Sequence, residues 1–355
     1  MKVLVVGGTG PTGMHVINGL IQRGHKVTIL HTGAHEVEFI EPVEHLHGSP
    51  FFRETLEETL GSRVFDLAIG LYGRTRYVAE AIKGRTPRFI AVGASSYVEG
   101  VPQPIPETAP MRKEPNFCYL IWLTEQVTME AHRQGHYSAT FFRYPMVYGP
   151  RQMAPTDWSF VRRILDGRKQ LILPDNGLVL DSMGYAENLA HALLLAVDKP
   201  NESAGQLYNI RDDTAFTVRQ RAELIAKIMN HEWEIINIPC ELALPSYPYV
   251  ALGRRKESWS YIGHRLTDIS KIKYELGYRD IVPVEEAIEQ TVKWLLEHKP
   301  EPGGTMETTL SDAFDYDNED RLVQEFRAFH KKASQIPFEG YLPMHSYAHP
   351  QKPEE

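Results

Sequence analysis

The first thirteen residues constrain the fold more than any other stretch of the chain. A short apolar, β-branched run at residues 2–6 ends in the turn Gly7-Gly8-Thr9-Gly10-Pro11-Thr12-Gly13. Apolar residues then recur at helical spacing through residues 14–23, and a second apolar run follows at residues 27–30. The pattern predicts strand, turn, helix and strand in succession, which is the opening unit of a parallel α/β sheet.

The glycines of this turn have the spacing of a dinucleotide-binding fingerprint. Gly7 permits a tight turn, Gly10 lets the backbone approach a pyrophosphate, and Gly13 lets the helix pack closely on the strand. The free N–H groups at the start of the helix attract phosphate charge. The alternative is a purely structural turn. We therefore expect a cofactor site formed by Gly7, Thr9, Gly10, Pro11, Thr12 and Gly13.

The segment after the second predicted strand bears on the choice of cofactor. In dinucleotide-binding folds a carboxylate there holds the adenosine ribose of NAD. This chain instead has His31-Thr32-Gly33-Ala34-His35. We expect His31 and Thr32 to lie near that ribose, where imidazoles and a hydroxyl could accept the 2′-phosphate of NADP. The sequence thus favours NADP over NAD, although no Arg is present, and His35 is better explained as an exposed loop residue.

Composition limits the partners. The chain has 355 residues, 42% of them hydrophobic and 24% charged, as in large globular proteins. A formal net charge of −8 argues against nucleic-acid and membrane-surface partners. Two cysteines suggest no disulfide framework, and the N-terminal apolar run is a strand rather than a signal segment. We expect a cytoplasmic protein with a small-molecule substrate. The fifteen histidines show no metal-ligand spacing, so no metal site is predicted.

Further along the chain, strands and helices alternate. Loops at the carboxyl ends of parallel strands are where ligands bind in such sheets. Tyr72, Gly73 and Arg74 follow one predicted strand and are therefore candidate cofactor-lining residues. The expected strands are residues 44–47, 65–70, 88–93 and 139–145, and the expected helices are residues 53–60, 75–82, 117–134, 158–167, 217–229 and 321–334.

Several blocks together resemble a known family, the extended short-chain dehydrogenase/reductases, also called the NAD-dependent epimerase/dehydratase family. Their order along the chain is that of the family, and they span roughly residues 1–298. The blocks are the glycine turn, Arg143-Tyr144-Pro145-Met146-Val147-Tyr148-Gly149-Pro150, and residues 181–190, 205–210 and 268–278.

The resemblance implies a doubly wound parallel α/β sheet (Rossmann) with a smaller, discontinuous substrate-binding lobe. The dinucleotide-binding domain would comprise residues 1–150 plus about 178–209, and the substrate lobe about 151–177 and 210–298. Residues 299–355 form a C-terminal extension that the family pattern does not cover. The resemblance also implies a homodimer and, most commonly, a sugar-nucleotide substrate. Tyr144, Pro145 and Val147 would line the cofactor site.

The aromatic and basic stretch Pro245–Ile262 could line a substrate pocket for an anionic or ring-containing group. A solvated loop with aromatic side chains in the core of the lobe explains it equally well.

In the family, catalysis uses a Ser or Thr after the fifth strand and a Tyr followed four residues later by Lys. The ammonium favours the phenolate, so the Tyr can exchange a proton with the substrate. Here Tyr119 matches the family Tyr, but Leu123 stands where Lys is expected. Ala94 falls at the Ser position, with Ser95 and Ser96 directly after it. The candidate catalytic residues are Tyr119, Ser95 and Ser96.

Three interpretations follow. In the first, Tyr119 still donates a proton with Ser95 or Ser96, and another cation replaces Lys; Arg74, Arg112 and Lys113 are the candidates. In the second, an atypical enzyme acts on an activated substrate that needs little acid help. In the third, the chain is a dinucleotide-binding sensor or interaction protein with weak or no catalysis. The sequence favours an NAD(P)-dependent oxidoreductase or epimerase/dehydratase over the third.

Overall fold

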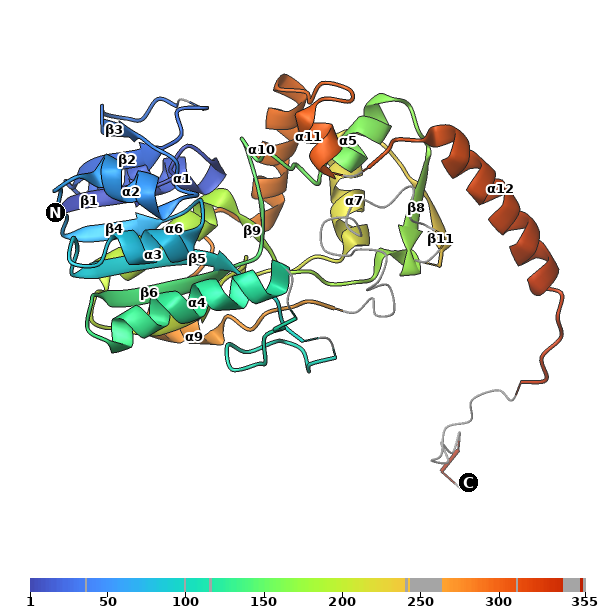
Figure 1. Ribbon diagram of the computed structural model, residues 1–355. Helices are drawn as coiled ribbons and strands as arrows, with labels where there is room; N and C mark the ends of the chain where they lie inside the picture. The colour runs from blue at the N-terminus through green and yellow to red at the C-terminus, as the bar shows by residue number, and fades with distance from the viewer. Residues whose placement is uncertain are drawn as a thin grey trace. The chain divides into compact units, whose positions relative to one another are not determined.

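The computed structural model describes residues 1–35, 37–98, 100–114, 117–239, 242, 264–310, 312–340 and 352–353. The chain divides into two compact units, Met1–Phe314 and Asp315–Glu355. The first unit contains the main sheet (Figure 1). In the described part of the chain, no helix combines the length and the apolar character needed to cross a bilayer.

The main sheet has seven strands, in the order β10-β6-β5-β4-β1-β2-β3, and every neighbouring pair is parallel. The order reverses direction at β1, which confirms the doubly wound parallel fold. The strands are β1 (Lys2–Val6), β2 (Lys26–His31), β3 (Glu44–His47), β4 (Leu67–Gly70), β5 (Arg88–Ala94), β6 (Ser138–Tyr144) and β10 (Gln206–Asn209).

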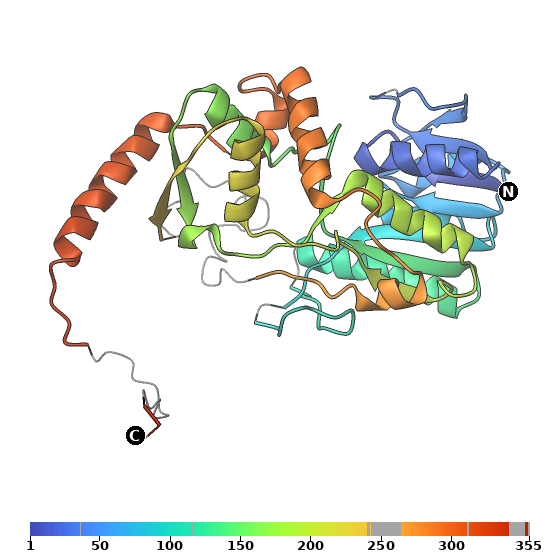
Figure 2. The same cartoon turned by 180° about the vertical axis from the view of Figure 1, so that it is seen from behind.

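Helices cover both faces of this sheet, as the two opposite views show (Figures 1 and 2). Side chains of β1 alternate between two cores, with Val3 and Val5 in one and Leu4 and Val6 in the other. Because both faces are buried, the strand reads as a continuous apolar run. On one face lie α1 (Pro11–Gln22) and α6 (Ala186–Asp198), and on the other lie α2 (Arg53–Leu60), α3 (Thr75–Ala81) and α4 (Phe117–Arg133).

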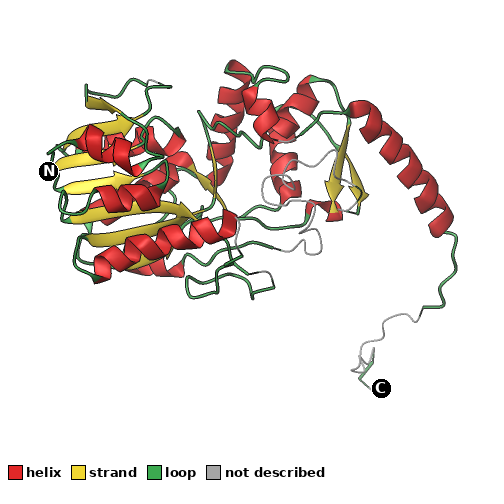
Figure 3. Ribbon diagram, viewed as in Figure 1, coloured by secondary structure: helices red, strands yellow, loops and turns green. Residues whose placement is uncertain are grey.

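A second group of elements lies outside the main sheet (Figure 3). Two short parallel pairs, β8 with β11 and β7 with β9, join segments that are distant in sequence. The side chain of Thr217 accepts a hydrogen bond from the Gln220 N–H at 3.1 Å and caps α7, as expected. The elements are β7 (Met146–Tyr148), α5 (Trp158–Leu165), β8 (Gln170–Pro174), β9 (Met183–Tyr185), α7 (Val218–Ile228), β11 (Glu234–Ile238) and α10 (Val284–Glu297), whereas α9 (Ser270–Glu275) packs through Ile272 against the core of the main sheet.

The C-terminal helix is longer than the sequence suggested. Helix α12 runs over Tyr316–Ala333, so the prediction that it begins at Arg321 is wrong. Asp315 accepts a hydrogen bond from the Asn318 N–H at 3.2 Å and caps the helix. The acidic residues after it lie in the first turn, where carboxylates interact favourably with the helix dipole. The acidic run, whose composition is typical of a loop, instead forms the first turn of a helix.

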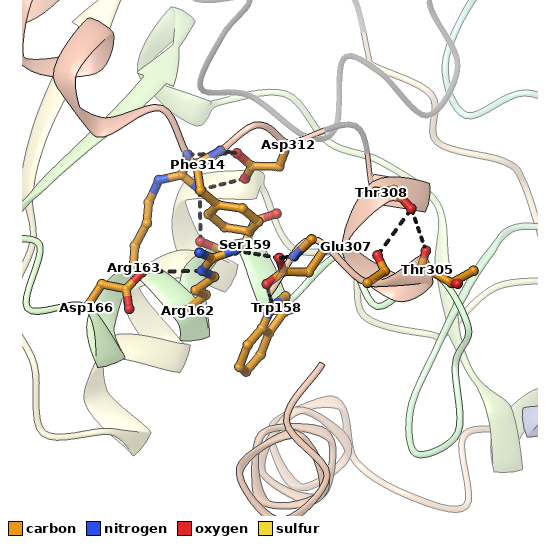
Figure 4. Close-up of polar contacts among 12 residues, drawn as sticks. Trp158, Ser159, Arg162, Arg163, Asp166, Thr305, Glu307, Thr308, Asp312 and Phe314 are labelled. Carbon is orange, nitrogen blue, oxygen red and sulfur yellow. Dashed lines mark hydrogen bonds and ion pairs between the residues drawn. The ribbon is translucent and has the colours of Figure 1, made fainter. Parts of the chain in front are cut away.

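The segment before that helix is anchored to α5 by buried polar contacts (Figure 4). In α11 (Thr305–Leu310), Glu307 accepts a hydrogen bond from Trp158 Nε1 at 2.8 Å and pairs with Arg162 at 2.5 Å. Arg163 donates to both carboxylate oxygens of Asp312 at 2.6 and 3.0 Å, and neither side chain is more than 1% exposed. Residues 305–314 of the extension are therefore an integral part of the first unit.

We predict that Asp312→Asn destabilises the protein by about 3–5 kcal/mol, because it leaves the buried charge of Arg163 without its counter-ion. Asp317→Asn, an exposed carboxylate in the first turn of α12, should cost less than about 1 kcal/mol. Denaturant unfolding of both variants tests this. Equal stabilities would mean that the Arg163–Asp312 pair does not anchor the segment.

Candidate functional site

The predicted site residues follow neighbouring strands of the main sheet. Residues 7–13 follow β1, and residues 31–35 lie at the end of β2 and after it. Residues 72–74 follow β4, and residues 95–97 follow β5. Because parallel strands end at the same edge of the sheet, these loops meet where the strand order reverses, which is where ligands bind in such folds.

The glycine turn has the backbone geometry that the sequence predicts. Gly7 and Gly8 have φ of +97° and +105°, a region that favours glycine. A Cβ on Gly13 would lie 2.4 Å from the Cα of Gly8, so α1 packs directly on the turn. A Cβ on Gly10 would meet nothing within 4 Å. At Gly7, Gly8 and Gly13 the place of a side chain is taken by other atoms of the protein, whereas beside Gly10 it is open.

Helix α1 presents its N-terminus at this open space. Gly10 is the N-cap and offers no side-chain cap, Pro11 opens the helix, and the first turn has no acidic residue. The Gly7 N–H donates to the Leu30 carbonyl at 2.8 Å and the Gly13 N–H to the Gly10 carbonyl at 3.1 Å, so an anion here would be bound by other N–H groups of the turn. The first turn of α1 places no carboxylate there to repel it. Thr12 is buried beside them, whereas Thr9 is partly exposed. These residues fit the pyrophosphate of a dinucleotide.

The loop after β4 lies against the glycine turn. A Cβ on Gly7 would be 2.8 Å from the Cβ of Tyr72, and Tyr72 itself is 59% exposed. Gly73 has φ of +91° and packs on Pro50. The Arg74 guanidinium donates to the Phe51 carbonyl at 3.2 Å, so it is held in the loop that follows β3. The structure thus brings Tyr72 to the glycine turn and directs Arg74 toward the loop after β3.

At the end of β2, His31 is only 4% exposed and its Nε2 lies 3.0 Å from His45 Nδ1. Thr32 and His35 are exposed. The hydroxyl of Thr32 is therefore more accessible to a ribose than the imidazole of His31. The sequence alone predicts both residues near that ribose and does not distinguish their exposure.

The candidate catalytic residues come from two elements. Tyr119 lies in the first turns of α4, is 38% exposed, and has its ring centroid 5.6 Å from that of Trp122. Ser95 and Ser96 follow β5 and are partly buried. Among the described residues, no hydrogen bond joins either serine to Tyr119. The structure therefore gives these candidates no hydrogen bond to one another among the described residues.

Of the three candidate cations, Lys113 is the one joined to the surroundings of Tyr119. Its Nζ lies 5.0 Å from the ring centroid of Trp122, which in turn contacts the Tyr119 ring. Arg112 lies near Glu114, 3.7 Å between charged atoms. Lys113 thus shares an aromatic neighbour with Tyr119.

Sequence reasoning missed a buried polar cluster beside Ser95 and Ser96. Arg143 of β6 pairs with both oxygens of Glu125 of α4, at 2.7 and 2.9 Å, and donates to the Tyr97 hydroxyl at 2.8 Å. The Tyr97 hydroxyl donates in turn to Asn209 Oδ1. The only signal in the sequence is a charged residue, Arg143, within an apolar strand.

The charges of this cluster suit a positioning role. Burial alone would lower the pKa of Arg143, but its hydrogen bonds to Glu125 and the charge of that carboxylate raise it. Burial raises the pKa of the Tyr97 phenol, and Arg143 opposes only part of that shift. Tyr97 therefore keeps its proton at neutral pH and holds the loop after β5 against β6.

The second group of elements contains a small hollow of about 10 Å³, which is room for about one water molecule. Its charged walls are paired: Arg221 binds both oxygens of Asp157 at 2.5 and 2.6 Å, and Asp212 accepts from the Tyr185 N–H at 2.9 Å. Burial raises the pKa of Asp212, and that hydrogen bond opposes the shift. The lining residues are Asp181, Met183, Arg211, Asp212, Thr214, Ala215, Phe216, Arg221 and Val284. The stretch 245–262, predicted as a pocket wall, lies outside the described residues.

Comparison with known proteins agrees with this arrangement. Residues 72–210 match the model of the NAD dependent epimerase/dehydratase family. This part of the chain is therefore similar to that family. The match begins in the loop after β4 and ends after β10, so it includes Ser95, Tyr119 and Tyr144 but not the glycine turn.

Known relatives of this family are distant. The chain is 26% identical over 181 residues to an uncharacterized protein of Escherichia coli, YbjS, a match that spans 45% of this chain and 50% of the relative. It is 23% identical over 332 residues to the UDP-N-acetyl-alpha-D-glucosaminuronate decarboxylase of Bacillus cytotoxicus, covering 83% and 98% of the two chains. A UDP-glucose 4-epimerase structure from Thermotoga maritima, with UDP-glucose, shares the fold at a TM-score of 0.68 and 22% identity, over 84% of this chain and 100% of that one.

The geometry of the glycine turn predicts opposite effects for two similar substitutions. Gly13→Ala should destabilise the fold by about 3 kcal/mol, because the new Cβ would overlap the backbone of Gly8. Gly10→Ala should change stability by less than about 1 kcal/mol but weaken dinucleotide binding, because its Cβ would enter the open space. Thermal unfolding and nucleotide titration separate the two. Unchanged binding by Gly10→Ala would exclude this turn as the cofactor site.

Proposed function

We propose that this protein is an NAD(P)-dependent oxidoreductase or epimerase-like enzyme. It would act by hydride transfer on a hydroxyl, carbonyl or activated double bond of a small molecule. The observation that carries the proposal is the glycine turn, in which Gly7, Gly8 and Gly13 are required by the backbone and Gly10 faces open space. An uncapped helix N-terminus beside that space suits a pyrophosphate.

The relatives indicate which substrates to test first. The names of two of them include UDP-N-acetyl-alpha-D-glucosaminuronate and UDP-glucose. We propose a sugar nucleotide as the first class of substrate, on this basis alone. The paired charges around Arg221 and Asp212 support a polar substrate but do not select one.

A bound nicotinamide would supply or accept the hydride. We assign the role of proton donor to the Tyr119 phenol. The hydroxyl of Ser95 or Ser96 would donate a hydrogen bond to the substrate oxygen. Leu123 cannot favour a phenolate or bind a ribose, so the active site is non-standard. We assign the missing positive charge to Lys113, because it lies over Trp122, the aromatic neighbour of Tyr119.

The alternative is a dinucleotide-binding sensor or interaction protein with weak or no catalysis. Leu123 is the observation that favours it, since the cofactor turn can persist without the catalytic ammonium. Binding of a dinucleotide with no turnover of any sugar nucleotide would support this alternative.

The proposed choice between NADP and NAD depends on the segment after β2. Thr32 and His35 are exposed, and the sequence places no carboxylate there before Glu36. We therefore propose that the site accepts NADP at least as well as NAD, although the family description names NAD. A homodimer and a cytoplasmic location also remain proposals, the first of which light scattering of the purified chain would test.

Fluorescence titration with NADH and NADPH, side by side, tests the proposed function directly. We expect saturable binding of at least one, because the turn is intact. Leu123→Lys should tighten the binding, since an ammonium at this position can hold the nicotinamide ribose. No binding of either nucleotide would refute the proposal. Unchanged affinity in the variant would mean that another cation already serves.

Once a substrate is found, Tyr119→Phe should lower turnover by about 10²–10⁴-fold while nucleotide affinity is unchanged, because only the phenolic proton is removed. Tyr72→Phe is the matched control, since it removes a phenol from the cofactor side of the site. Full turnover by the Tyr119 variant would exclude Tyr119 as the acid.

A further inference from the structure

Three histidines lie on one face of two adjacent strands. His31 ends β2, and His45 and His47 are in β3, the edge strand of the sheet. In the parallel register His31 is opposite His47, and His45 is opposite Ile29. Because side chains alternate along a strand, residues 29 and 31 of β2 and 45 and 47 of β3 share a face. The sheet itself therefore brings the three imidazoles together.

The imidazoles are close to one another. Ring centroids of His31 lie 5.1 Å from those of His45 and 5.0 Å from those of His47, and the remaining pair is 6.3 Å apart. One ring nitrogen of each lies within 4.8 Å of the others, and His31 Nε2 is 3.0 Å from His45 Nδ1. His31 is buried, whereas His47 is exposed, so the cluster is anchored on one side and open to solvent on the other.

We propose that His31, His45 and His47 bind a divalent transition-metal ion, with Zn²⁺ as the representative. Tetrahedral zinc with bonds of roughly 2.0–2.1 Å needs ligand nitrogens a little over 3 Å apart, which the observed spacing approaches. Three imidazoles suit zinc, nickel or copper, whereas magnesium and calcium prefer oxygen. Three protein ligands leave a fourth position for water or an anion.

The nearest carboxylate on β3 is already engaged. Glu44 accepts from the Thr28 hydroxyl at 2.9 Å and lies 3.6 Å from Arg63. The proposed ligand set is therefore nitrogen only, which sharpens the expected preference for zinc over magnesium.

Binding would change the proton on His31. The Gly33 N–H donates to His31 Nδ1 at 3.3 Å. A neutral imidazole that gives its Nε2 lone pair to a metal carries its proton on Nδ1, so this hydrogen bond must break. Gly33 lies in the exposed turn after β2 and has φ of +80°. Because this turn is exposed, it can rearrange without changing β2 or β3. The lost hydrogen bond lowers the affinity for the metal.

The linear sequence could not reveal this cluster. His45 and His47 are two residues apart in a strand, which puts them on one face, but two histidines alone do not make a metal site. His31 comes from the neighbouring strand, and only the strand register places it between them. The absence of metal-ligand spacing in the sequence is therefore no argument against this cluster.

The test is calorimetric titration of the full chain, without a polyhistidine tag, after treatment with EDTA and without nucleotide. We expect one Zn²⁺ per chain and no binding of Mg²⁺. His47→Ala should weaken zinc binding by at least about 10–100-fold. Because His47 is exposed, this variant should fold, which circular dichroism verifies. His35→Ala and His136→Ala, both exposed and outside the cluster, should bind as wild type does.

Cobalt provides a second measurement, because Co²⁺ in a tetrahedral site gives strong visible absorption that His45→Ala should abolish. No stoichiometric zinc binding by the wild-type chain would overturn the proposal. Zinc binding that His47→Ala leaves intact would do the same, by placing the metal elsewhere. Because His31 adjoins the proposed ribose site, the nucleotide titration is made without zinc, so that failure of the metal proposal and failure of the cofactor proposal are distinguished.

Discussion

The close approach of α1 to the backbone of Gly8 at Gly13 is the constraint on which the packing around β1 depends. A side chain on Gly13 would lie 2.4 Å from the Cα of Gly8, so α1 can reach its position only without one. That position lets Val16 and Ile17 pack against Val3 and Val5. It also points the helix N-terminus at the open space beside Gly10. Fold stability and anion binding therefore rest on the same close approach.

A buried ion pair also fixes the geometry near the candidate catalytic residues. Arg143 and Glu125 join β6 to α4, the helix that carries Tyr119. The same guanidinium holds Tyr97, and with it the loop that carries Ser95 and Ser96. One charged side chain in the sheet thus orients both sources of candidate catalytic groups. Such pairs add little net stability but fix geometry, since losing one partner leaves a buried charge.

Much of the fold was predictable because apolar periodicity reports burial. The strands around β1 and the helices α1, α2 and α4 begin and end within a few residues of where periodicity placed them. The start of α12 was missed because carboxylates are typical both of loops and of first helical turns. The anchoring of Glu307 and Asp312 was missed because their arginines, Arg162 and Arg163, lie 145 and 149 positions away along the chain.

The sequence by itself determined the opening strand–turn–helix unit, the parallel sheet and the family resemblance, because these depend on local spacing of glycines and apolar residues. It also predicts that Leu123 stands where the family has a lysine. Only the tertiary structure decided that Thr32 rather than His31 is exposed, that Tyr97 joins Arg143, and that three histidines meet on one face. Those relations arise from strand register and side-chain packing, which bring together residues whose separation in sequence carries no signal.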